Sequence, residues 1–266
     1  MNYYFFLPAP GLDCEIGLAN FAPADSGHRH LVEQHVCSAR AVDGVWLTDN
    51  HGTIKPGRLR AVRPSDIGLT HDDAASCLVF MSPQPVSGRM NTLPRPAGFE
   101  CAPAWRANLR IIAASTSVSY QGEYPAGMFD IRQPGLVSIC AMLQPGLINS
   151  LFLASFNGRA AQHEGSIQIS RLKTGEVLAE APAAWNRVNH IDLSAIDLPA
   201  TPELVLLSSN DMAGIPIFFS RDVDAHHLSL EHTHPPAELT VFGEPDARNR
   251  VIRKMRAAWL GLTRHA

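Results

Sequence analysis

The segment Ser166-Ile-Gln-Ile-Ser-Arg-Leu172 decides the fold class of this chain. Polar and apolar residues alternate along it, so an extended backbone places Ile167 and Ile169 on one face, with Ser166 and Gln168 on the other. Alternation over this length is typical of a β-strand with one buried face. The segment therefore predicts a strand, and its surroundings indicate which kind of sheet that strand joins.

Strand-like runs follow one another at intervals of about ten residues between positions 105 and 233, and the first of them covers residues 109–120. Turn sequences such as Gln144-Pro-Gly146 and Lys173-Thr-Gly175 separate them. A parallel sheet needs crossover helices, and no helical periodicity interrupts these runs. We therefore predict an all-β fold, with an antiparallel β-sandwich or jelly-roll over residues 104–243.

The first 103 residues predict a loop-rich β region that precedes this main domain. Turn signals are dense and include Asp49-Asn-His-Gly52 and Lys55-Pro-Gly57, which favour short strands. Residues 26–41 show a modest helical spacing and predict one helix. Residues 83–103 hold five prolines and two glycines with little periodicity, which predicts a linker.

Residues 244–266 change to a helical period. Their apolar stripe consists of Val251, Met255, Trp259 and Leu262. Basic residues occupy the other positions: Arg248, Arg250, Arg253, Lys254 and Arg256. We predict a C-terminal amphipathic helix that docks its stripe on the sandwich. The alternative is a basic helix face that contacts an acidic partner, nucleic acid or anionic lipid.

Composition narrows the function classes. The net charge of −3 excludes a strongly basic protein and gives no strong nucleic-acid signal. No run approaches the roughly 18 apolar residues of a membrane span, and the apolar residues 1–8 lack the features of a signal peptide. The five cysteines are scattered without a CxxC pair. These features predict reduced thiols and a cytoplasmic chain.

The basic residues are unevenly divided into nineteen arginines and three lysines. A GC-rich bacterial genome gives this bias without any functional cause. The functional alternative is planar recognition of carboxylate or phosphate groups, which favours arginine over lysine.

Histidines gather in the segment His226–Glu238 of the sequence. A strand there would place His232 and His234 on one face, and Glu238 can return as a third ligand after Pro235-Pro236. Two imidazoles and a carboxylate suit a divalent iron, zinc, manganese or nickel ion. The metal would act as a Lewis acid or activate water or oxygen, with both histidines in the catalytic site. A structural role or a subunit interface is the alternative.

The spacing of His232, His234 and Glu238 resembles the first metal-binding motif of the cupins. That resemblance implies a β-barrel and a metal-dependent activity. It covers these three residues only, because His226 stands where the motif has an upstream glycine and no second motif follows. The family is therefore not assigned.

A polar and aromatic cluster surrounds Gly122 in the sequence. Its members are Tyr120, Gln121, Glu123 and Tyr124. Tyrosine rings that stack, together with amide and carboxylate partners, suit recognition of a sugar or a peptide. Gly122 would permit a positive φ in the turn. Glu123 is also a candidate acid/base if it shares a pocket with the histidines; the alternative is an ordinary hairpin turn.

A second polar loop, Ser208–Pro216 in the sequence, separates two apolar runs. Asn210 and Asp211 are candidates to bind a substrate or a cation, and Asx turns are the alternative for such residues.

Three functions follow from these patterns. The first is a binding module that recognises a glycan or a protein partner through the Tyr120–Tyr124 turn. The second is a metal-dependent enzyme that uses His232, His234 and Glu238. The third is an assembly subunit, a homo-oligomer with the basic helix and the histidine-rich strand at its interface. Whether the chain is an enzyme stays open at this stage.

Overall fold

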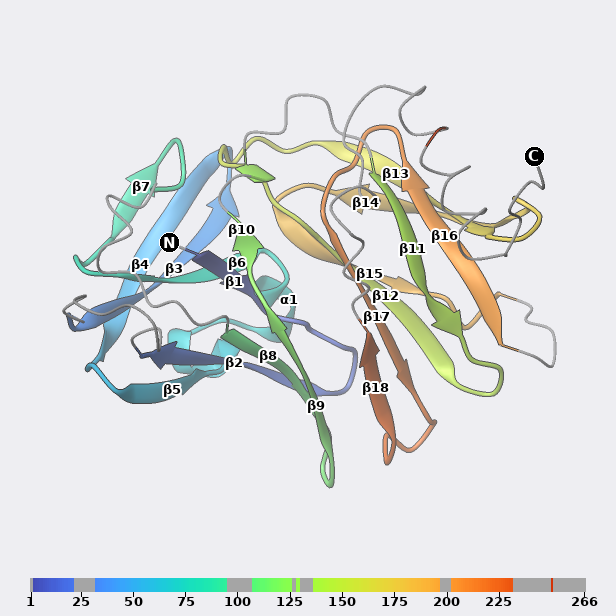
Figure 1. Ribbon diagram of the computed structural model, residues 1–266. Coiled ribbons are helices and arrows are strands. Elements are labelled where there is room, and N and C mark those ends of the chain that lie inside the picture. The colour runs from blue at the N-terminus through green and yellow to red at the C-terminus, as the bar shows by residue number, and fades with distance from the viewer. Residues whose placement is uncertain are drawn as a thin grey trace, which may run out of the picture. The chain divides into compact units, whose positions relative to one another are not determined.

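The computed structural model describes residues 2–21, 32–94, 107–125, 128–129, 136–196, 202–231 and 250. These residues form four antiparallel β-sheets and two helices of one turn each, so the predicted all-β class is confirmed (Figure 1). No helix within these ranges is long and apolar enough to cross a membrane.

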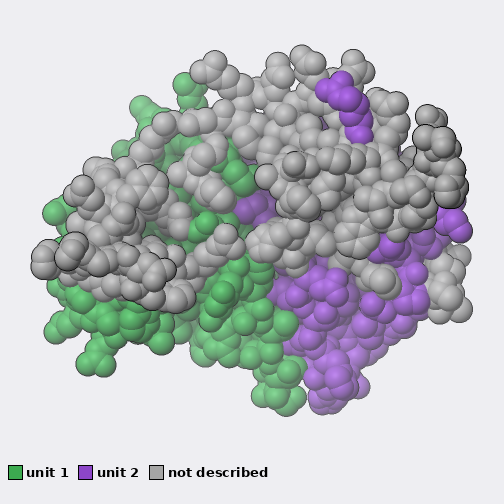
Figure 2. Space-filling view, viewed as in Figure 1, with its two compact units in different colours: residues 1–130, 156–162, 186–188 green, residues 131–155, 163–185, 189–266 purple. Residues whose placement is uncertain are grey.

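The chain divides into two compact units (Figure 2). Unit 1 contains residues 1–130, 156–162 and 186–188, and unit 2 contains residues 131–155, 163–185 and 189–266. The division differs from the predicted boundary at 103/104, because strands between residues 107 and 125 hydrogen-bond with the beginning of the chain. Segment 156–162 belongs to unit 1 for a similar reason: Gly158 N–H donates to Phe129 O at 3.3 Å, and Gly158 O accepts from Leu93 N at 2.8 Å.

The larger sheet of unit 1 has the order β10-β1-β6-β3-β4-β7. Its strands are β1 (Asn2–Phe5), β3 (Gln34–Val42), β4 (Val45–Ile54), β6 (Cys77–Ser82), β7 (Gly88–Met90) and β10 (Tyr124–Pro125). Strand β6 lies inside the sheet and is buried along its whole length, as its apolar sequence Cys-Leu-Val-Phe-Met predicts. Aromatic rings cover one part of the sheet, where Tyr3 contacts Phe80 and Phe129 with ring centroids 5.1 and 4.9 Å apart.

The second sheet of unit 1, which we call the β2–β8 sheet, has the order β5-β2-β8-β9. Its strands are β2 (Asp13–Asn20), β5 (Arg58–Val62), β8 (Ala107–Ile112) and β9 (Ser117–Gly122). The inward residues of β2 and β8 are apolar and buried: Cys14, Ile16, Leu18, Leu109 and Ile111. The opposite side of the sheet is its outer face. Two short helices, η1 (Pro64–Ile67) and α1 (His71–Ala74), follow β5.

The remaining strands form two four-stranded sheets. The β13–β16 sheet has the order β11-β16-β13-β14, and the β12–β17 sheet has the order β15-β12-β17-β18. Their bounds are β11 (Leu136–Leu143), β12 (Ile148–Ser155), β13 (Glu164–Arg171), β14 (Val177–Ala184), β15 (Arg187–Asp192), β16 (Glu203–Ser209), β17 (Ile215–Arg221) and β18 (Leu228–Glu231). One apolar cluster draws side chains from both sheets, including Leu151, Leu153, Ile167, Ile169 and Leu207. The alternating segment 166–172 thus contributes its isoleucines to this core.

Three local predictions in the first half of the chain were wrong. The predicted helix over 26–41 is strand β3 from Gln34 onward, because β4 and β6 pair with this segment on both sides. The predicted turn Asp49–Gly52 lies inside β4, where a β-bulge between β3 and β4 absorbs the positive φ of Gly52 (+91°). The single run predicted over 109–120 is the hairpin β8–β9.

Buried asparagine side chains complete the hydrogen bonding of unit 2. The Asn189 amide accepts from Ala184 N (2.7 Å) and donates to Ala184 O (2.9 Å) and Leu153 O (3.2 Å). Ala184 ends β14 and Leu153 belongs to β12, so this side chain joins the two sheets. Asn149 bonds both backbone groups of Gln144 in the same way. Such contacts are necessary because a buried backbone group without a partner costs free energy.

We expect Asn189→Ala to lower the free energy of unfolding by about 2–4 kcal/mol, because it leaves buried backbone groups of Ala184 and Leu153 without their partner. Urea unfolding followed by circular dichroism measures the change. Asn210→Ala is the matched control, since Asn210 is exposed and its truncation should cost less than about 0.5 kcal/mol. Equal effects of the two substitutions would contradict this account of Asn189.

Candidate functional site

The predicted tyrosine cluster is divided between the surface and the core. Tyr120 and Gln121 lie on β9, Glu123 follows that strand, and Tyr124 begins β10. Gln121 is exposed, and Tyr120 and Glu123 are half-buried. Tyr124 is fully buried. The cluster therefore offers three side chains to a ligand rather than four.

A glycine is needed at position 122 for a reason other than the positive φ that the sequence predicts. Its φ is not positive. A Cβ placed on Gly122 would lie 2.0 Å from Cε1 of Tyr120, because the tyrosine ring lies across the glycine. The absence of a side chain at Gly122 therefore fixes where the Tyr120 ring packs.

Tyr124 occupies the aromatic core of unit 1. Its hydroxyl donates to Phe156 O at 2.7 Å and accepts from Phe156 N at 3.0 Å. Its ring stacks on Phe129 at a centroid distance of 5.3 Å. These contacts satisfy both the polar and the apolar parts of the side chain. Burial raises the pKa of the Tyr124 phenol.

Glu123 lies near the buried Tyr4. Burial, and secondarily the negative charge of Glu123, raise the pKa of the Tyr4 phenol. The predicted meeting of Glu123 with His232 and His234 falls outside the described residues, as do both histidines and Glu238. Within the described ranges, no group of three potential ligands is arranged to hold a metal ion. The metal site thus remains a prediction.

Asp211 anchors the loop between β16 and β17 to β13. Its Oδ1 accepts from Ser166 N at 3.3 Å and from the Ser209 hydroxyl at 2.8 Å. A Cβ on Gly165 would lie 2.8 Å from the Asp211 carboxyl carbon, so the carboxylate packs directly on that backbone. Asn210, next to it, is exposed. The carboxylate of Asp211 is thus engaged in the loop, and the Asn210 amide is the accessible part of this pair.

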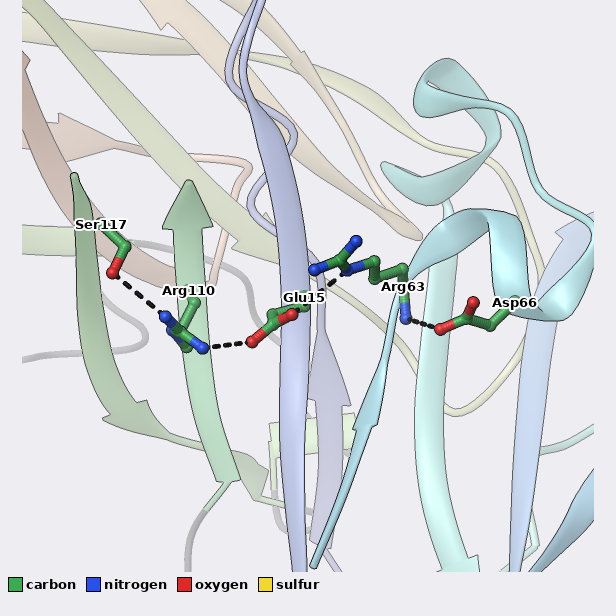
Figure 3. A network of polar contacts seen from close by, with 5 residues as sticks. All are labelled: Glu15, Arg63, Asp66, Arg110 and Ser117. Carbon is green, nitrogen blue, oxygen red and sulfur yellow. Dashed lines mark hydrogen bonds and ion pairs between the residues drawn. The ribbon is translucent and has the colours of Figure 1, made fainter. Parts of the chain in front are cut away.

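A buried carboxylate organises the outer face of the β2–β8 sheet (Figure 3). Glu15 of β2 lies directly opposite Arg110 of β8, and Arg63 follows β5 on the other side. The Glu15 carboxylate accepts from Arg110 Nη1 and from Arg63 Nε, the latter at 3.3 Å. The side chain of Glu15 is 6% exposed, whereas those of Arg63 and Arg110 are 54% and 40% exposed. One buried anion therefore orients two accessible cations.

Two further contacts fix these arginines. Arg110 Nη2 donates to the Ser117 hydroxyl at 3.1 Å, and Arg63 N donates to Asp66 Oδ2 at 2.9 Å (Figure 3). Asp66 therefore holds the backbone of Arg63 and not its guanidinium. The Nη nitrogens of Arg63 form no hydrogen bond with any described residue. The Arg63 side chain is also 54% exposed.

The rest of the outer face carries small, polar and apolar residues together. Asn108 of β8 is paired with Gln121 of β9 and with Gly17 of β2, and Gly17 is paired with Ala61 of β5. Leu59 of β5 is 70% exposed. On the outer face, Arg63 and Arg110 accompany the carboxylates of Asp13 and Glu15, whereas Arg58 and Arg60 are paired with Asn20 and Leu18 and belong to the opposite side of the sheet. The arginine and carboxylate charges of the outer face therefore balance, and the two guanidinium groups are more exposed than the carboxylate of Glu15.

Comparisons with protein-family models, with curated proteins and with solved structures gave no match.

A second polar cluster lies between β3 and β4. The Ser38 hydroxyl and His51 Nε2 are 2.8 Å apart. The bulge at Gly52 lies next to His51, and Arg60 Nη1 donates to His51 O at 2.7 Å. Burial is the main cause that lowers the pKa of His51; the charge of Asp49 opposes it, and the smaller influence of the Arg60 charge adds to it. The neutral imidazole is therefore favoured.

The sequence analysis missed both clusters. Glu15, Arg63 and Arg110 are far apart in the chain, and only the pairing of β2 with β5 and β8 brings them together. A carboxylate inside the mostly apolar segment Asp13–Asn20 was the available signal, because a buried charge requires a partner. For His51 the signal was a histidine beside a glycine in a strand-like run, which is typical of a bulge.

We expect Glu15→Gln to lower the free energy of unfolding by about 1–3 kcal/mol, because the two hydrogen bonds lose the negative charge of their acceptor and the repulsion between the arginines is no longer compensated. Urea unfolding at low and high salt measures the effect. Glu180→Gln, at an exposed carboxylate of β14, is the control and should change stability little. If the two substitutions cost the same, Glu15 does not organise this face.

His51 should make the free energy of unfolding depend on pH. Its folded pKa lies below the ordinary value of 6.5, so the unfolded chain takes up the proton first as the pH falls. The stability from neutral His51 is present above 6.5 and is lost as the pH falls through the folded pKa. We expect His51→Gln to lose less stability than wild type between pH about 8 and about 5.5. Parallel curves in urea unfolding would contradict this.

Proposed function

We propose that the chain is a binding module whose unit 1 recognises an acidic segment of a protein partner through the outer face of the β2–β8 sheet. The observation that carries the proposal is the Glu15 carboxylate, which holds Arg63 and Arg110 in place and leaves the Nη nitrogens of Arg63 for another acceptor. Arginine suits this task because its planar fork matches a carboxylate. Pre-oriented side chains also lose less entropy on binding.

Charge and shape support an acidic protein segment rather than a glycan. The exposed guanidinium groups of Arg63 and Arg110 attract a carboxylate, because the Glu15 charge that holds them is buried. The middle of the face consists of Gly17, Ala19 and Ala61, which have little or no side chain, so an extended chain can lie across it without a clash. Sugar recognition favours an exposed aromatic ring, and Tyr120 shares the inward side of Leu109, with its ring across Gly122.

The proposal keeps the binding role predicted from the Tyr120–Tyr124 turn and extends its surface. Gln121 lies on the outer face opposite Asn108, and Tyr120 and Glu123 lie beside it in the chain. We also propose that unit 2 is a β-sandwich, which the single apolar core shared by its two sheets supports. The C-terminal helix over 244–266 and the cytoplasmic location stay predictions.

The experiment measures binding of the full chain to two synthetic extended peptides, one with glutamate at alternate positions and one with glutamine there. We expect binding of the glutamate peptide only, with an affinity that falls as salt rises. Arg63→Gln should weaken it about tenfold, the loss of one charged hydrogen-bonded contact. Arg89→Gln is the matched control, because Arg89 is exposed on β7 outside this sheet.

Three results would contradict the proposal: no binding of the glutamate peptide, equal binding of the glutamine peptide, or equal losses in the two arginine variants. A glycan array measured in parallel tests the alternative ligand class, and a glycan that binds in a salt-independent way would support that class instead. Circular dichroism establishes that each variant is folded.

A further inference from the structure

Ser38 and His51 form a nucleophile–base pair that the proposed binding function does not use. Ser38 Oγ lies 2.8 Å from His51 Nε2, within the range in which an imidazole takes a hydroxyl proton. The backbone of Ser38 lies in the ladders of β3, paired with Asp49 on one side and Val79 on the other. Among the described residues, the hydrogen-bond partner of its hydroxyl is the imidazole.

The backbone around His51 is built to hold the ring in this position. His35 pairs with Thr53 and Cys37 with Asn50, so two residues of β4, His51 and Gly52, stand opposite Val36 alone. Such a bulge redirects a side chain at the cost of regular pairing. Gly52 permits it through a φ of +91°, and Arg60 of β5 fixes the His51 carbonyl. The bulge and the hydrogen bond from Arg60 together place the His51 imidazole next to the Ser38 hydroxyl.

The surroundings leave the pair reactive and partly accessible. Ser38 is 7% exposed, His51 is half-buried, and Asp49 and Asn50 beside it are exposed. A base must be neutral to accept a proton, and the surroundings of His51 favour the neutral ring. Because Ser38 is only 7% exposed, the substrates considered are small acyl esters rather than polymers.

We propose that Ser38 is the nucleophile of an esterase site that transfers small acyl groups from esters to water. Ser38 Oγ forms a bond to the ester carbonyl carbon while its proton passes to His51 Nε2. The carbon–oxygen bond to the alcohol then breaks, and the alcohol leaves with the proton from His51. Water attacks the acyl-serine, gives its proton to His51, and releases the acid as Ser38 regains a proton. The net reaction converts ester and water into acid and alcohol.

The test treats the full chain with a small alkyl fluorophosphonate, which forms a covalent bond with an activated serine and releases fluoride. We expect one adduct by intact mass, mapped to Ser38 by peptide sequencing, and p-nitrophenyl acetate hydrolysis that the adduct abolishes. His51→Gln should slow labelling at least about a hundredfold, the usual contribution of a general base. Ser119→Ala, at an exposed serine of β9, is the control and should be labelled at the wild-type rate.

The adduct position in the wild-type chain decides the result even if a variant fails to fold. A folded wild-type chain without an adduct on Ser38 would overturn the proposal. Labelling of Ser38 at the same rate in folded His51→Gln would also overturn it, because His51 would then not act as the base. Binding of the glutamate peptide is measured separately, so a failure of the esterase proposal does not affect the result for peptide binding by the outer face.

Discussion

The pairing of β2 with β8 is the interaction on which unit 1 depends. It joins residues 13–17 to residues 108–112, so the whole of β3 to β7 lies in the loop that this pairing closes. Closing such a loop costs conformational entropy before any contact forms. Burial of Cys14, Ile16, Leu109 and Ile111 offsets that cost, and each paired residue satisfies backbone groups that would otherwise be buried alone. The Glu15–Arg110 contact exists only because this register brings the two residues opposite each other.

Three buried asparagine side chains join backbone segments of different parts of the chain. Asn149 and Asn189 each bond the N–H and the C=O of one backbone residue. The side-chain amide thus makes the two hydrogen bonds that a residue of a neighbouring strand would make. Asn186 instead bonds three different residues of segment 156–162, accepting from Asn157 N and donating to Arg159 O and Ala161 O. An amide suits this role because it carries a donor and an acceptor together. These residues look like ordinary turn residues in the sequence, and their neighbours in space give them their structural role.

Sequence periodicity predicted what is local and missed what depends on pairing. The alternation at 166–172 and the turns at Gly146 and Gly175 were confirmed, since strand faces and positive φ values are properties of a short stretch of chain. The helix over 26–41 and the turn at Asp49–Gly52 were wrong because β3 and β4 pair there regardless of local spacing. Neither Glu15 nor Ser38 could be recognised as part of a cluster, because their partners are 48 and 13 residues away and a single sequence does not specify the register.

Strand β5 and the residue after it contact both the Glu15 cluster and the Ser38–His51 pair. Arg60 of β5 donates to the backbone of His51, and Arg63, directly after β5, donates to Glu15. Within the described residues β5 pairs only with β2, over the five positions 58–62. Charged residues on such an edge strand also discourage pairing with another chain, so Arg58 and Arg60 need no ligand to explain them. Arg63 differs from them, since it lies beyond the paired positions and is fixed by Glu15 and Asp66. Protection of an edge requires charge but not a fixed orientation, and the fixed orientation of Arg63 is therefore the feature that favours recognition over edge protection.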